Sequence, residues 1–228
     1  MTADIDVVVP ALNAARSLAG TLDSLKGCHD LRLSITVCDG GSHDGTAAIA
    51  RQAGATVLAS EPGRGRQLAA GAMAGRAPWL LFLHADTVLS AGWTAAARQF
   101  MAEATHVPKA GYFRLRFDSA DPRARRLERL VAWRCRTFGL PYGDQGLLID
   151  RELYRRTGGF RPLPLMEDVD FVRRLGRRSL AAIDAEVVTS AERYERDGWL
   201  ARPMRNLGCL ALYFAGLSPG VIRRLYGA

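Results

Sequence analysis

One apolar stretch near the middle of the chain limits what the protein can fold into. Residues 79–83, Trp-Leu-Leu-Phe-Leu, form an unbroken apolar run that ends at the polar triplet 84–86, His-Ala-Asp. Such a run, of strand length, is typical of a central strand covered on both faces. Ligand sites in open α/β sheets lie just beyond the carboxyl ends of such strands. Asp86 is therefore predicted at a ligand site, where a carboxylate can hold a hard divalent cation that also binds phosphate oxygens. The alternative is that Asp86 only caps the following turn.

Strands and helices alternate through the first half of the chain. Predicted strands cover residues 5–10, 33–38, 56–59 and 79–83, and predicted helices cover residues 16–25, 46–53, 68–74 and 93–101. Such regular alternation favours a parallel sheet with right-handed crossovers. The second strand ends in a glycine-rich turn in which Ser42, Asp44 and Thr46 are predicted to shape the turn and cap the next helix. Residues 61–67, which include Arg64 and Arg66, are predicted to form a flexible basic loop.

The second half of the chain is predicted to be richer in helix. An arginine-rich helix is expected over residues 122–138, with Leu127, Leu130 and Val131 on its apolar side. Strands are expected over residues 111–117, 147–149, 180–183 and 187–190, and helices from residue 151, within 163–170, over 200–217 and over 219–226. The late apolar run 207–217 is too short to span a bilayer.

The excess positive charge lies entirely in the second half. Residues 1–121 carry 11 Lys and Arg against 11 Asp and Glu, whereas residues 122–228 carry 20 arginines against 12 acids, which gives the net charge of +8. Arginine favours phosphate and carboxylate partners or an anionic membrane surface. No nucleic-acid recognition motif accompanies the charge, so we expect no nucleic-acid partner. A solvated basic face is the simpler alternative.

Length, cysteines and the N-terminus indicate an intracellular folded domain. The 228 residues suit one domain, or a domain with an extension. Four cysteines without CxxC spacing favour small buried side chains in a reducing compartment. Residues 1–6 carry two acids, and the apolar run 7–9 is too short for a signal peptide. We expect a cytoplasmic protein, with a peripheral position at the inner face of the membrane as a further hypothesis.

Four motifs occur in order along the chain: VVVPALN at 7–13, CDGGSHDGT at 38–46, LHAD at 83–86 and MED at 166–168. Their order and spacing resemble family 2 glycosyltransferases of the GT-A fold. Four further segments, GRQ at 65–67, FLHADT at 82–87, GDQG at 143–146 and PLMED at 164–168, look like a small bacterial subfamily of arsenosugar-biosynthesis-type glycosyltransferases. Each motif is weak alone, but four in the correct order and spacing make a strong signal, and the likeness covers nearly the whole chain.

The resemblance implies a single GT-A, Rossmann-like α/β domain with a mostly parallel central sheet flanked by helices. This domain would span residues 1–199, with a nucleotide-binding half at 1–121 and an acceptor and catalytic half at 122–199. Residues 200–228 would form a C-terminal helical extension. That extension is expected to pack on the domain; a homodimer contact and an interfacial membrane helix near a lipid-linked acceptor are the alternatives.

The resemblance also implies roles for particular residues. Asp86 would ligate a divalent metal, Mn²⁺ or Mg²⁺, and Asp168 would be the general base, with Glu167 beside it. The residues that would bind the nucleotide-sugar donor are Pro10, Ala11, Asn13, Asp39, Gly41, Arg66, His84 and Ala85. Asp39 would accept hydrogen bonds from the base, although an aspartate before glycines also suits an ordinary turn. Asp168 also suits an ordinary acid at a helix start.

The implied reaction is an inverting, metal-dependent transfer of a sugar from a nucleotide-diphosphate donor, most commonly UDP-linked in the family, to a hydroxyl acceptor. The acceptor would be a small molecule or lipid-linked. The Gln-x-x-Arg-Trp motif of processive relatives is missing, which predicts a non-processive enzyme. Two positions depart from the family pattern: Ala14 replaces a common glutamate, and His84 stands where the first metal-motif aspartate usually stands. His84 would ligate the metal, touch the nucleotide, or only pack.

Other functions fit the sequence less well. A NAD-dependent oxidoreductase is disfavoured because Gly-x-Gly-x-x-Gly is absent after the first strand. A sugar nucleotidyltransferase would need a glycine-rich basic loop at the same place, and residues 10–13 contain no glycine. A non-catalytic sugar-nucleotide-binding or membrane-surface protein of the same fold is the main alternative.

Overall fold

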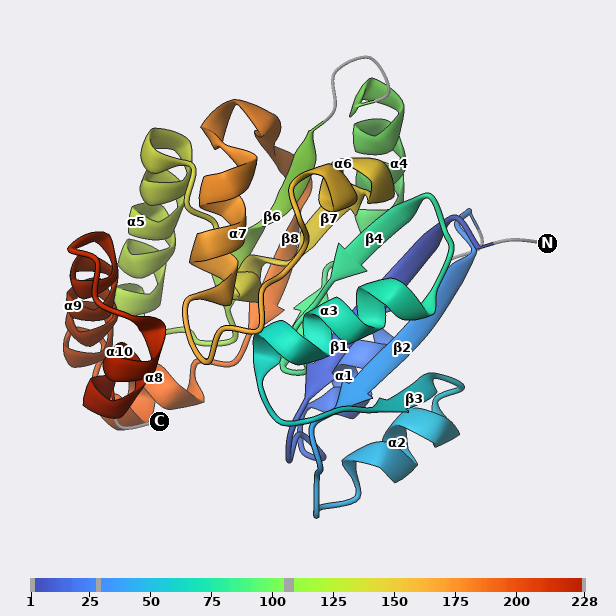
Figure 1. Ribbon diagram of the computed structural model, residues 1–228, viewed down its shortest axis with the longest axis horizontal. Coiled ribbons are helices and arrows are strands. Elements are labelled where there is room, and N and C mark those ends of the chain that lie inside the picture. The colour runs from blue at the N-terminus through green and yellow to red at the C-terminus, as the bar shows by residue number, and fades with distance from the viewer. Residues whose placement is uncertain (1–2, 28–29, 105–108, 227–228) are drawn as a thin grey trace.

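An eight-stranded sheet runs through the protein, with helices on both of its faces (Figure 1). The computed structural model describes residues 3–27, 30–104 and 109–226. The strand order across the sheet is β3-β2-β1-β4-β7-β6-β8-β5. The strands are β1 (Ile5–Ala11), β2 (Leu33–Asp39), β3 (Thr56–Ala59), β4 (Trp79–Phe82), β5 (Thr87–Leu89), β6 (Ala110–Phe117), β7 (Leu147–Asp150) and β8 (Leu180–Thr189).

The helices follow the strands in chain order. The α-helices are α1 (Leu18–Asp23), α2 (Thr46–Gln52), α3 (Arg64–Ala74), α4 (Trp93–Ala104), α5 (Pro122–Phe138), α6 (Arg151–Arg156), α7 (Glu167–Leu175), α8 (Glu192–Asp197), α9 (Ala201–Phe214) and α10 (Pro219–Tyr226). Two short 3₁₀ helices are η1 (Gly143–Gln145) and η2 (Arg177–Ser179).

The sheet is parallel in its first half and mixed in its second. β1 pairs in parallel with both β2 and β4, and β2 pairs in parallel with β3. β7 then runs antiparallel to β4 and β6, β6 pairs in parallel with β8, and β5 closes the edge antiparallel to β8. The predicted α/β fold with a mostly parallel central sheet flanked by helices is confirmed.

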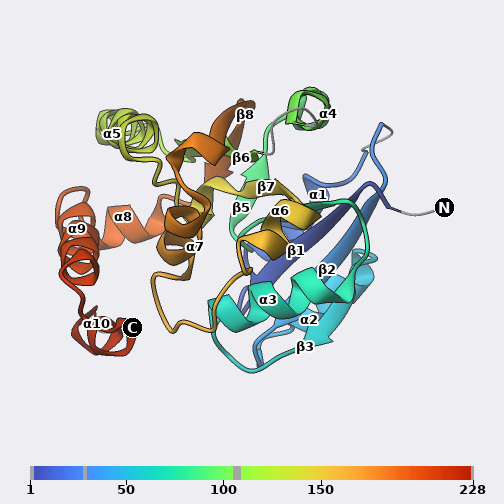
Figure 2. The same cartoon turned by 45° about the horizontal axis from the view of Figure 1, so that its top comes forward.

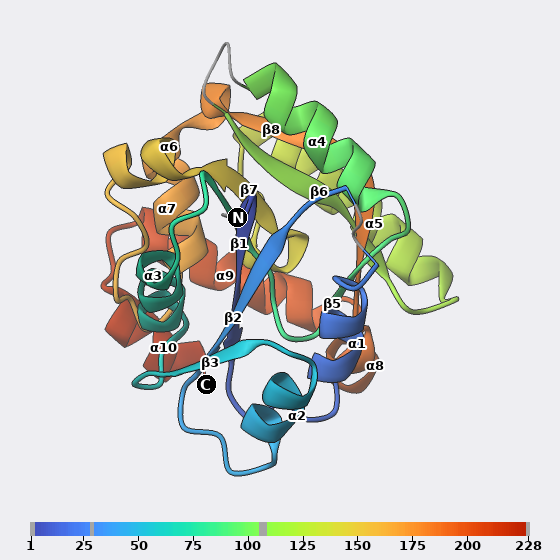
Figure 3. The same ribbon diagram turned by 90° about the vertical axis from the view of Figure 1, so that its right-hand side faces the viewer.

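Both faces of the central strands are buried, as the unbroken apolar runs predicted. On β4 and the residue after it, Leu81 and Leu83 join one apolar cluster, while Leu80 and Phe82 join another on the opposite face. Figure 3 shows α3, α6 and α7 on one side of the sheet and α1, α4 and α5 on the other. The central strands therefore have no solvent-facing side, and polar residues within them, such as Asp6 of β1 and Thr36 of β2, are buried.

The predicted basic loop at residues 61–67 is wrong over its second part. α3 begins at Arg64, so residues 64–67 form its first turn, and the Gln67 backbone N–H donates to the Gly63 carbonyl at 3.0 Å. A Cβ on Gly65 would lie 2.2 Å from the Arg161 carbonyl oxygen. The glycine was interpreted as a loop residue, but it lets the helix pack closely against the segment that leads to α7.

The two strands predicted over 180–183 and 187–190 are one strand, β8. Asp184 and Glu186 alternate with the buried residues Ile183, Ala185 and Val187, so the polar residues only mark its exposed side. β5 and α8 were not predicted. β5 has three residues and is recognisable only through its pairing with β8.

The arginine-rich helix α5 has the predicted bounds. Asp121 accepts a hydrogen bond from the Arg123 backbone N–H at 2.7 Å, Pro122 occupies the first turn, and Gly139 ends the helix at a φ of 62°. The prediction that Leu130 lies on the buried side is wrong, because its side chain is 61% exposed. The buried side carries Ala124, Glu128, Val131 and Cys135 instead.

The C-terminal helices α8, α9 and α10 lie along one side of the protein, beyond α7 (Figure 2). α9 packs through Leu210, which joins Val169 and Val172 of α7 in a small apolar cluster. Leu207 and Phe214 of the same helix are exposed. Within the described residues, no helix has both the length and the apolar character needed to cross a membrane.

The cysteines match their predicted role where the structure describes them. Cys38, Cys135 and Cys209 are free and buried, and burial raises the pKa of Cys38 to about 12. Cys28 lies outside the described residues. Neutral thiols of this kind pack as small apolar groups.

Candidate active site

A cleft of about 640 Å³ opens at the carboxyl ends of the parallel strands. β1, β2 and β4 all end at this edge, because Ala11 pairs with Asp39 and Val8 pairs with Phe82. The cleft is lined by eight of the predicted site residues: Pro10, Ala11, Asn13, His84, Ala85, Asp86, Glu167 and Asp168. Residues from both halves of the chain therefore meet in one cavity.

The turn after β1 is held by the glycine-rich motif after β2. The backbone N–H of Asn13 donates to the Ser42 hydroxyl at 2.8 Å, and the Asn13 side-chain oxygen accepts from the His43 N–H at 3.0 Å. The N–H groups of the next two residues donate to Thr46 Oγ1 and Asp44 Oδ2. Asn13 has a φ of 50°, a left-handed conformation that asparagine tolerates. The motif thus does more than cap α2: it fixes the chain at the cleft.

Asp39, Gly41 and Arg66 are not among the residues that line the cleft. Asp39 accepts a short hydrogen bond from the Ser42 hydroxyl and lies at the carboxyl end of β2, beside Ala11. Gly41 has a φ of 92° and supplies the turn. Arg66 is half-exposed and forms an ion pair with Glu61. None of these three residues lines the cleft, so their contacts with a donor stay predictions.

The first turn of α3 places Arg64 in the cleft and Gln67 beneath it. Arg64 forms an ion pair of 3.3 Å with the buried Glu167. The Gln67 amide donates two hydrogen bonds of 2.7 Å, to the carbonyls of Ala11 and Cys38, and so ties the ends of β1 and β2 together. Gln67 of the GRQ motif therefore has a structural role that the sequence did not predict.

His84 lies in the cleft as a neutral imidazole. Burial, together with the positive charges of Arg64 and Arg193, lowers its pKa well below the ordinary value. Its buried Nε2 atom has no hydrogen-bond partner among the described residues. A Cβ on Gly143 would lie 2.5 Å from that atom, so the glycine leaves room for the ring. A neutral Nε2 with a free lone pair can accept a hydrogen bond or ligate a metal.

Asp144 is a further carboxylate in the cleft. Burial raises its pKa to about 6, against the opposing effect of Arg134, and the nearby charges of Asp168 and Asp86 also raise it. Its buried Oδ1 atom has no hydrogen-bond partner among the residues that the structure describes. An unpaired buried carboxylate oxygen is costly and marks a position where a ligand group is expected.

Gln145, the neighbour of Asp144 in the GDQG motif, is structural. Its side chain is 1% exposed, donates to the Phe113 carbonyl at 3.1 Å and accepts from Arg134. The structure separates them: Asp144 lines the cleft and Gln145 anchors the turn.

Glu167 and Asp168 begin α7 at the wall opposite β1. Asp168 Oδ2 accepts a 2.9 Å hydrogen bond from the Gly143 backbone N–H, and Oδ1 accepts from the Val169 N–H. Glu167 is 3% exposed, and burial followed by the charge of Asp168 raises its pKa, while Arg64 opposes the shift. Asp168 faces the cleft with a fixed orientation, whereas Glu167 is enclosed and paired.

The C-terminal helices supply a basic wall that was only partly predicted. Arg193 of α8, Arg202 of α9 and Arg223 of α10 line the cleft. Arg202 forms an ion pair of 2.7 Å with Asp197. Arg196 of α8 pairs with Asp197 and is not a lining residue.

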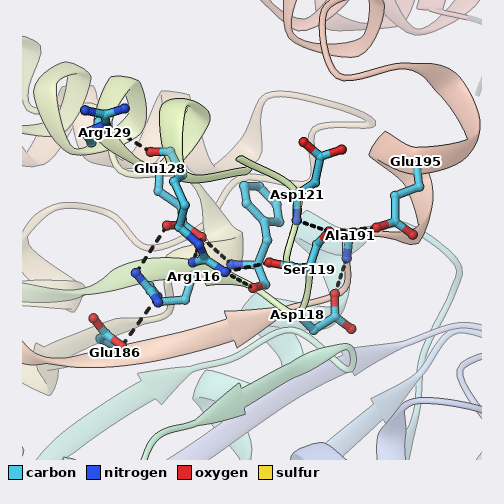
Figure 4. Close-up of polar contacts among 11 residues, drawn as sticks. Arg116, Asp118, Ser119, Asp121, Glu128, Arg129, Glu186, Ala191 and Glu195 are labelled. Carbon is cyan, nitrogen blue, oxygen red and sulfur yellow. Dashed lines mark hydrogen bonds and ion pairs between the residues drawn. The ribbon is translucent and has the colours of Figure 1, made fainter. Parts of the chain in front are cut away.

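The loop after β6 holds α8 in place (Figure 4). Asp118 Oδ1 accepts from the Ala191 N–H at 2.6 Å, and the Ser119 hydroxyl donates to Glu195 at 2.8 Å. On the other side of this loop, the buried Glu128 of α5 accepts from the Phe117 N–H at 2.8 Å. These contacts connect α5, β6 and α8, the helix that carries Arg193.

The cleft residues fit a divalent cation that arrives with a diphosphate. The described residues contain no cluster of three or more His, Cys, Asp or Glu side chains able to hold a metal by themselves. Mg²⁺ sites commonly use one or two carboxylates plus substrate phosphates and water. Asp86, with the unpaired His84 Nε2 and Asp144 Oδ1 nearby in the same cleft, offers oxygen and nitrogen ligands of this kind.

Comparison with known families identifies the class of this protein. The model of glycosyl transferase family 2 matches residues 6–179, which is most of the chain. The chain therefore belongs to glycosyl transferase family 2. No curated protein matches the sequence.

Solved glycosyltransferases share the fold. S. aureus TarS in complex with UDP-GlcNAc superimposes with a TM-score of 0.62 at 16% identity, over 83% of this chain and 58% of that chain. Glucosyl-3-phosphoglycerate synthase from Mycobacterium tuberculosis gives 0.55 at 21% identity, over 82% and 70%. The mannosyltransferase PcManGT from Pyrobaculum calidifontis gives 0.68 at 19% identity, over 100% and 69%. This chain spans only 58% of the TarS chain, and identities this low show the fold alone.

Proposed function

We propose that this protein transfers a sugar from a nucleotide-diphosphate sugar to a hydroxyl acceptor, with inversion at the anomeric carbon and with a divalent cation. One observation carries the proposal: Asp86 and Asp168, which come from opposite halves of the chain, line the same cleft as the turn after β1. Asp86 would then bind the cation and, through it, the diphosphate, and Asp168 in the same cleft would act on the acceptor hydroxyl.

The donor would be a nucleotide-diphosphate sugar, and a UDP-linked sugar is the first candidate. TarS was solved with UDP-GlcNAc, the mycobacterial synthase with UDP and Mn²⁺, and PcManGT with GDP-Man and Mn²⁺. Asp39 and Gly41 would contact the nucleotide base from the end of β2, and Arg66 the base or the phosphates. Pro10, Ala11, Asn13, His84 and Ala85 would line the remaining nucleotide pocket.

The phosphates would meet positive charge on two sides of the cleft. Arg64 and Arg193 both line it, and both are close enough to His84 to lower its pKa. Asp86, with His84 Nε2 as a second candidate ligand, would hold Mn²⁺ or Mg²⁺. When bound, such a cation neutralises the charge that develops on the leaving diphosphate.

Asp168 would act as the general base. Both of its oxygens accept backbone N–H groups, which hold the carboxylate towards the cleft and leave lone pairs free for a proton. The acceptor oxygen forms a bond to the anomeric carbon as the bond from that carbon to the diphosphate oxygen breaks. The hydroxyl proton passes to Asp168, and the nucleoside diphosphate leaves. A single displacement without a covalent enzyme intermediate gives inversion.

Glu167 is better placed to position groups than to exchange protons with the acceptor. It is enclosed and paired with Arg64. It would hold Arg64 over the cleft, and its charge would limit how far that guanidinium moves. The partnership suits a diphosphate that binds and leaves in each catalytic cycle.

Two classes of hydroxyl acceptor fit the proposed reaction. The absence of Gln-x-x-Arg-Trp supports transfer of one sugar at a time. The resemblance of the GRQ, FLHADT, GDQG and PLMED segments to arsenosugar-biosynthesis-type enzymes supports a small hydroxyl acceptor as one hypothesis, and a lipid-linked hydroxyl is the other. Both present the same chemical group to Asp168.

An Asp168→Asn variant tests the proposal. The amide keeps a hydrogen-bond acceptor for the Gly143 N–H but cannot take a proton, so turnover should fall about 10²–10⁴-fold. Stabilisation by nucleoside diphosphate and Mn²⁺ should be retained. Asp184→Asn is the matched control, because the Asp184 side chain is 88% exposed on β8, and it should leave turnover unchanged.

The alternative function is a non-catalytic sugar-nucleotide-binding or membrane-surface protein of the same fold. It would need the nucleotide pocket but not Asp168. Parent protein that binds nucleoside diphosphates yet turns over none of the common nucleotide sugars, with either small or lipid-linked hydroxyl acceptors, would favour this alternative.

A further inference from the structure

The exposed apolar side chains gather on one part of the protein. Of the twelve large hydrophobic side chains exposed in the described residues, nine come from α5, α9 with the residue before it, and α10. They are Leu130, Trp133, Phe138, Leu200, Met204, Leu207, Phe214, Val221 and Leu225. Figures 1 and 2 place these three helices along the same side of the protein. We call this surface the α5–α9–α10 face.

α9 shows how ordered this surface is. Residues 200, 204, 207, 211 and 214 follow each other at intervals of three or four, so they form one stripe along the helix. All five are exposed, and four of them are large and apolar. Cys209 and Leu210 are buried on other sides of the same helix. The helix therefore has an inner apolar contact and, separately, an outward apolar stripe.

The charge of the same helices has one sign. α5, α9 and α10 contain ten arginines, no lysine or aspartate, and one glutamate. That glutamate, Glu128, is buried and already paired with Arg116 and Arg125. The apolar side chains thus lie on helices whose charge is mainly positive. Their exposed arginines include Arg126, Arg129, Arg136, Arg223 and Arg224, whereas Arg202 and Arg205 form ion pairs with Asp197.

The exposed apolar side chains and the positive charge together favour one binding partner for the apolar stripe over another. In a twofold symmetric dimer the same patch meets itself, so the arginines of one copy would face those of the other. Like charges brought together in this way oppose association. An anionic lipid surface offers both complements at once: phosphate groups for the arginines and an apolar layer for the leucine and phenylalanine side chains.

We propose that the α5–α9–α10 face binds the surface of an anionic lipid bilayer. The arginines contact lipid phosphates, and the apolar stripe of α9 enters the boundary between headgroups and acyl chains. α9 also lines the cleft through Arg202 and Asn206. The bilayer would then lie about one helix diameter, roughly 10 Å, from the cleft. This inference deepens the proposed function, on which its second part rests: the acceptor is a hydroxyl compound held at the membrane.

Vesicle co-sedimentation tests the surface. The full chain is mixed with vesicles of phosphatidylcholine alone or of phosphatidylcholine with phosphatidylglycerol. We expect binding to the anionic vesicles, weak binding to the neutral ones, and a decrease with added salt because salt screens the charges. Leu207→Ser with Phe214→Ser should lower the partition coefficient about tenfold per side chain. Arg136→Gln with Arg224→Gln should lower it about fivefold per arginine.

Matched control substitutions test whether vesicle binding is specific to the α5–α9–α10 face. Met73 of α3 is 80% exposed and lies outside the face, so Met73→Ser should not alter binding. Arg156 of α6 is also exposed and outside it, so Arg156→Gln should have little effect. The melting temperature of each variant shows that the chain is folded, which is expected because the substituted side chains are exposed.

Two outcomes would overturn the inference. The first is equal sedimentation of parent and Leu207→Ser/Phe214→Ser protein with anionic vesicles, or none for either. The second is a concentration-dependent dimer, seen by light scattering, that the same substitutions abolish, since a second copy would then cover the stripe. Stabilisation by nucleoside diphosphate, measured without vesicles, reports separately on the proposed function.

Discussion

The Asp168 carboxylate accepts a 2.9 Å hydrogen bond from the backbone N–H of Gly143, and this bond joins α7 to the turn that carries Asp144. The side of Gly143 that lacks a Cβ faces His84. One glycine therefore connects three polar groups of the cleft: the proposed base Asp168, His84 of the LHAD motif and Asp144 of the GDQG motif.

Gly143→Ala should disturb the cleft. Its Cβ would lie 2.5 Å from His84 Nε2, so the imidazole or the turn must move. We expect a loss of about 1–3 kcal/mol in the free energy of unfolding, together with weaker nucleotide binding. Gly208→Ala is the control, because no atom lies within 4 Å of a Cβ there and the residue is inside α9. Chemical denaturation should show that the control gains up to about 1 kcal/mol; equal behaviour of the two variants would contradict the predicted clash.

Asp144→Asn should make the protein more stable at neutral pH but not at pH 4. The folded state raises the pKa of Asp144 to about 6, so it binds the proton more tightly than the unfolded chain does. Ionisation therefore costs native-state stability as the pH rises from about 4 to about 6, and the cost is constant above that. The asparagine avoids this cost. Urea denaturation should show no difference at pH 4, a gain that grows up to pH 6, and a constant gain beyond.

The same variant should have impaired turnover, since the unpaired Oδ1 is expected to meet a ligand group. Asp184→Asn, on an exposed side chain, provides the pH control. A stability difference between Asp144→Asn and parent that does not vary with pH would show that Asp144 is not buried as described.

Ser42→Ala should weaken nucleotide binding without unfolding the protein. The Ser42 hydroxyl accepts from the Asn13 N–H at 2.8 Å and donates to Asp39, so it links the two segments expected around the nucleotide. Loss of such a hydrogen bond corresponds to about a fivefold to tenfold increase in Kd. Calorimetric titration with UDP and Mn²⁺ measures it. Thr157→Ala removes a hydroxyl contact to the Leu153 carbonyl at the end of α6, outside the cleft, and should leave the Kd unchanged.

Glu128→Ala should lower stability and leave nucleotide binding intact. Glu128 is 8% exposed, and its loss would leave the buried Phe117 N–H without its acceptor. We expect a cost of about 1–3 kcal/mol. Glu152→Ala on α6 is the matched control: its partner is Arg155, both side chains are exposed, and the change should stay within about 0.5 kcal/mol. Similar losses in both variants would contradict the buried role of Glu128.

Much of the first half of the fold was predictable because local pattern and burial agree there. The run 79–83 is buried on both faces, so its unbroken apolar character has one physical cause. α5 has both a start signal at Asp121 and a stop signal at Gly139, and its bounds were correct. The same reasoning failed where tertiary contacts decide: β5 exists only by pairing with β8, and α3 starts early because Gly65 packs against a distant carbonyl.

The site was predictable to a similar degree. Asp86 and Asp168 share the cleft as the motifs implied, since strand ends and a helix start both leave carboxylates at that edge. The sequence did not separate Asp144 from Gln145, because adjacent residues in a turn differ only in which way the backbone directs them. It also gave no sign that Arg202 and Arg223 reach the cleft, which depends on how α9 and α10 pack.

The most direct test of the account is the melting temperature with a panel of nucleoside diphosphates, in Mn²⁺, in Mg²⁺ and in EDTA. A ligand of the native state at about a hundredfold excess over its Kd adds roughly 2.7 kcal/mol. We predict that one diphosphate, UDP first, raises the melting temperature only with the cation, and that Asp86→Ala abolishes the increase. No stabilisation by any diphosphate, or full stabilisation of Asp86→Ala, would contradict the proposed donor and cation site.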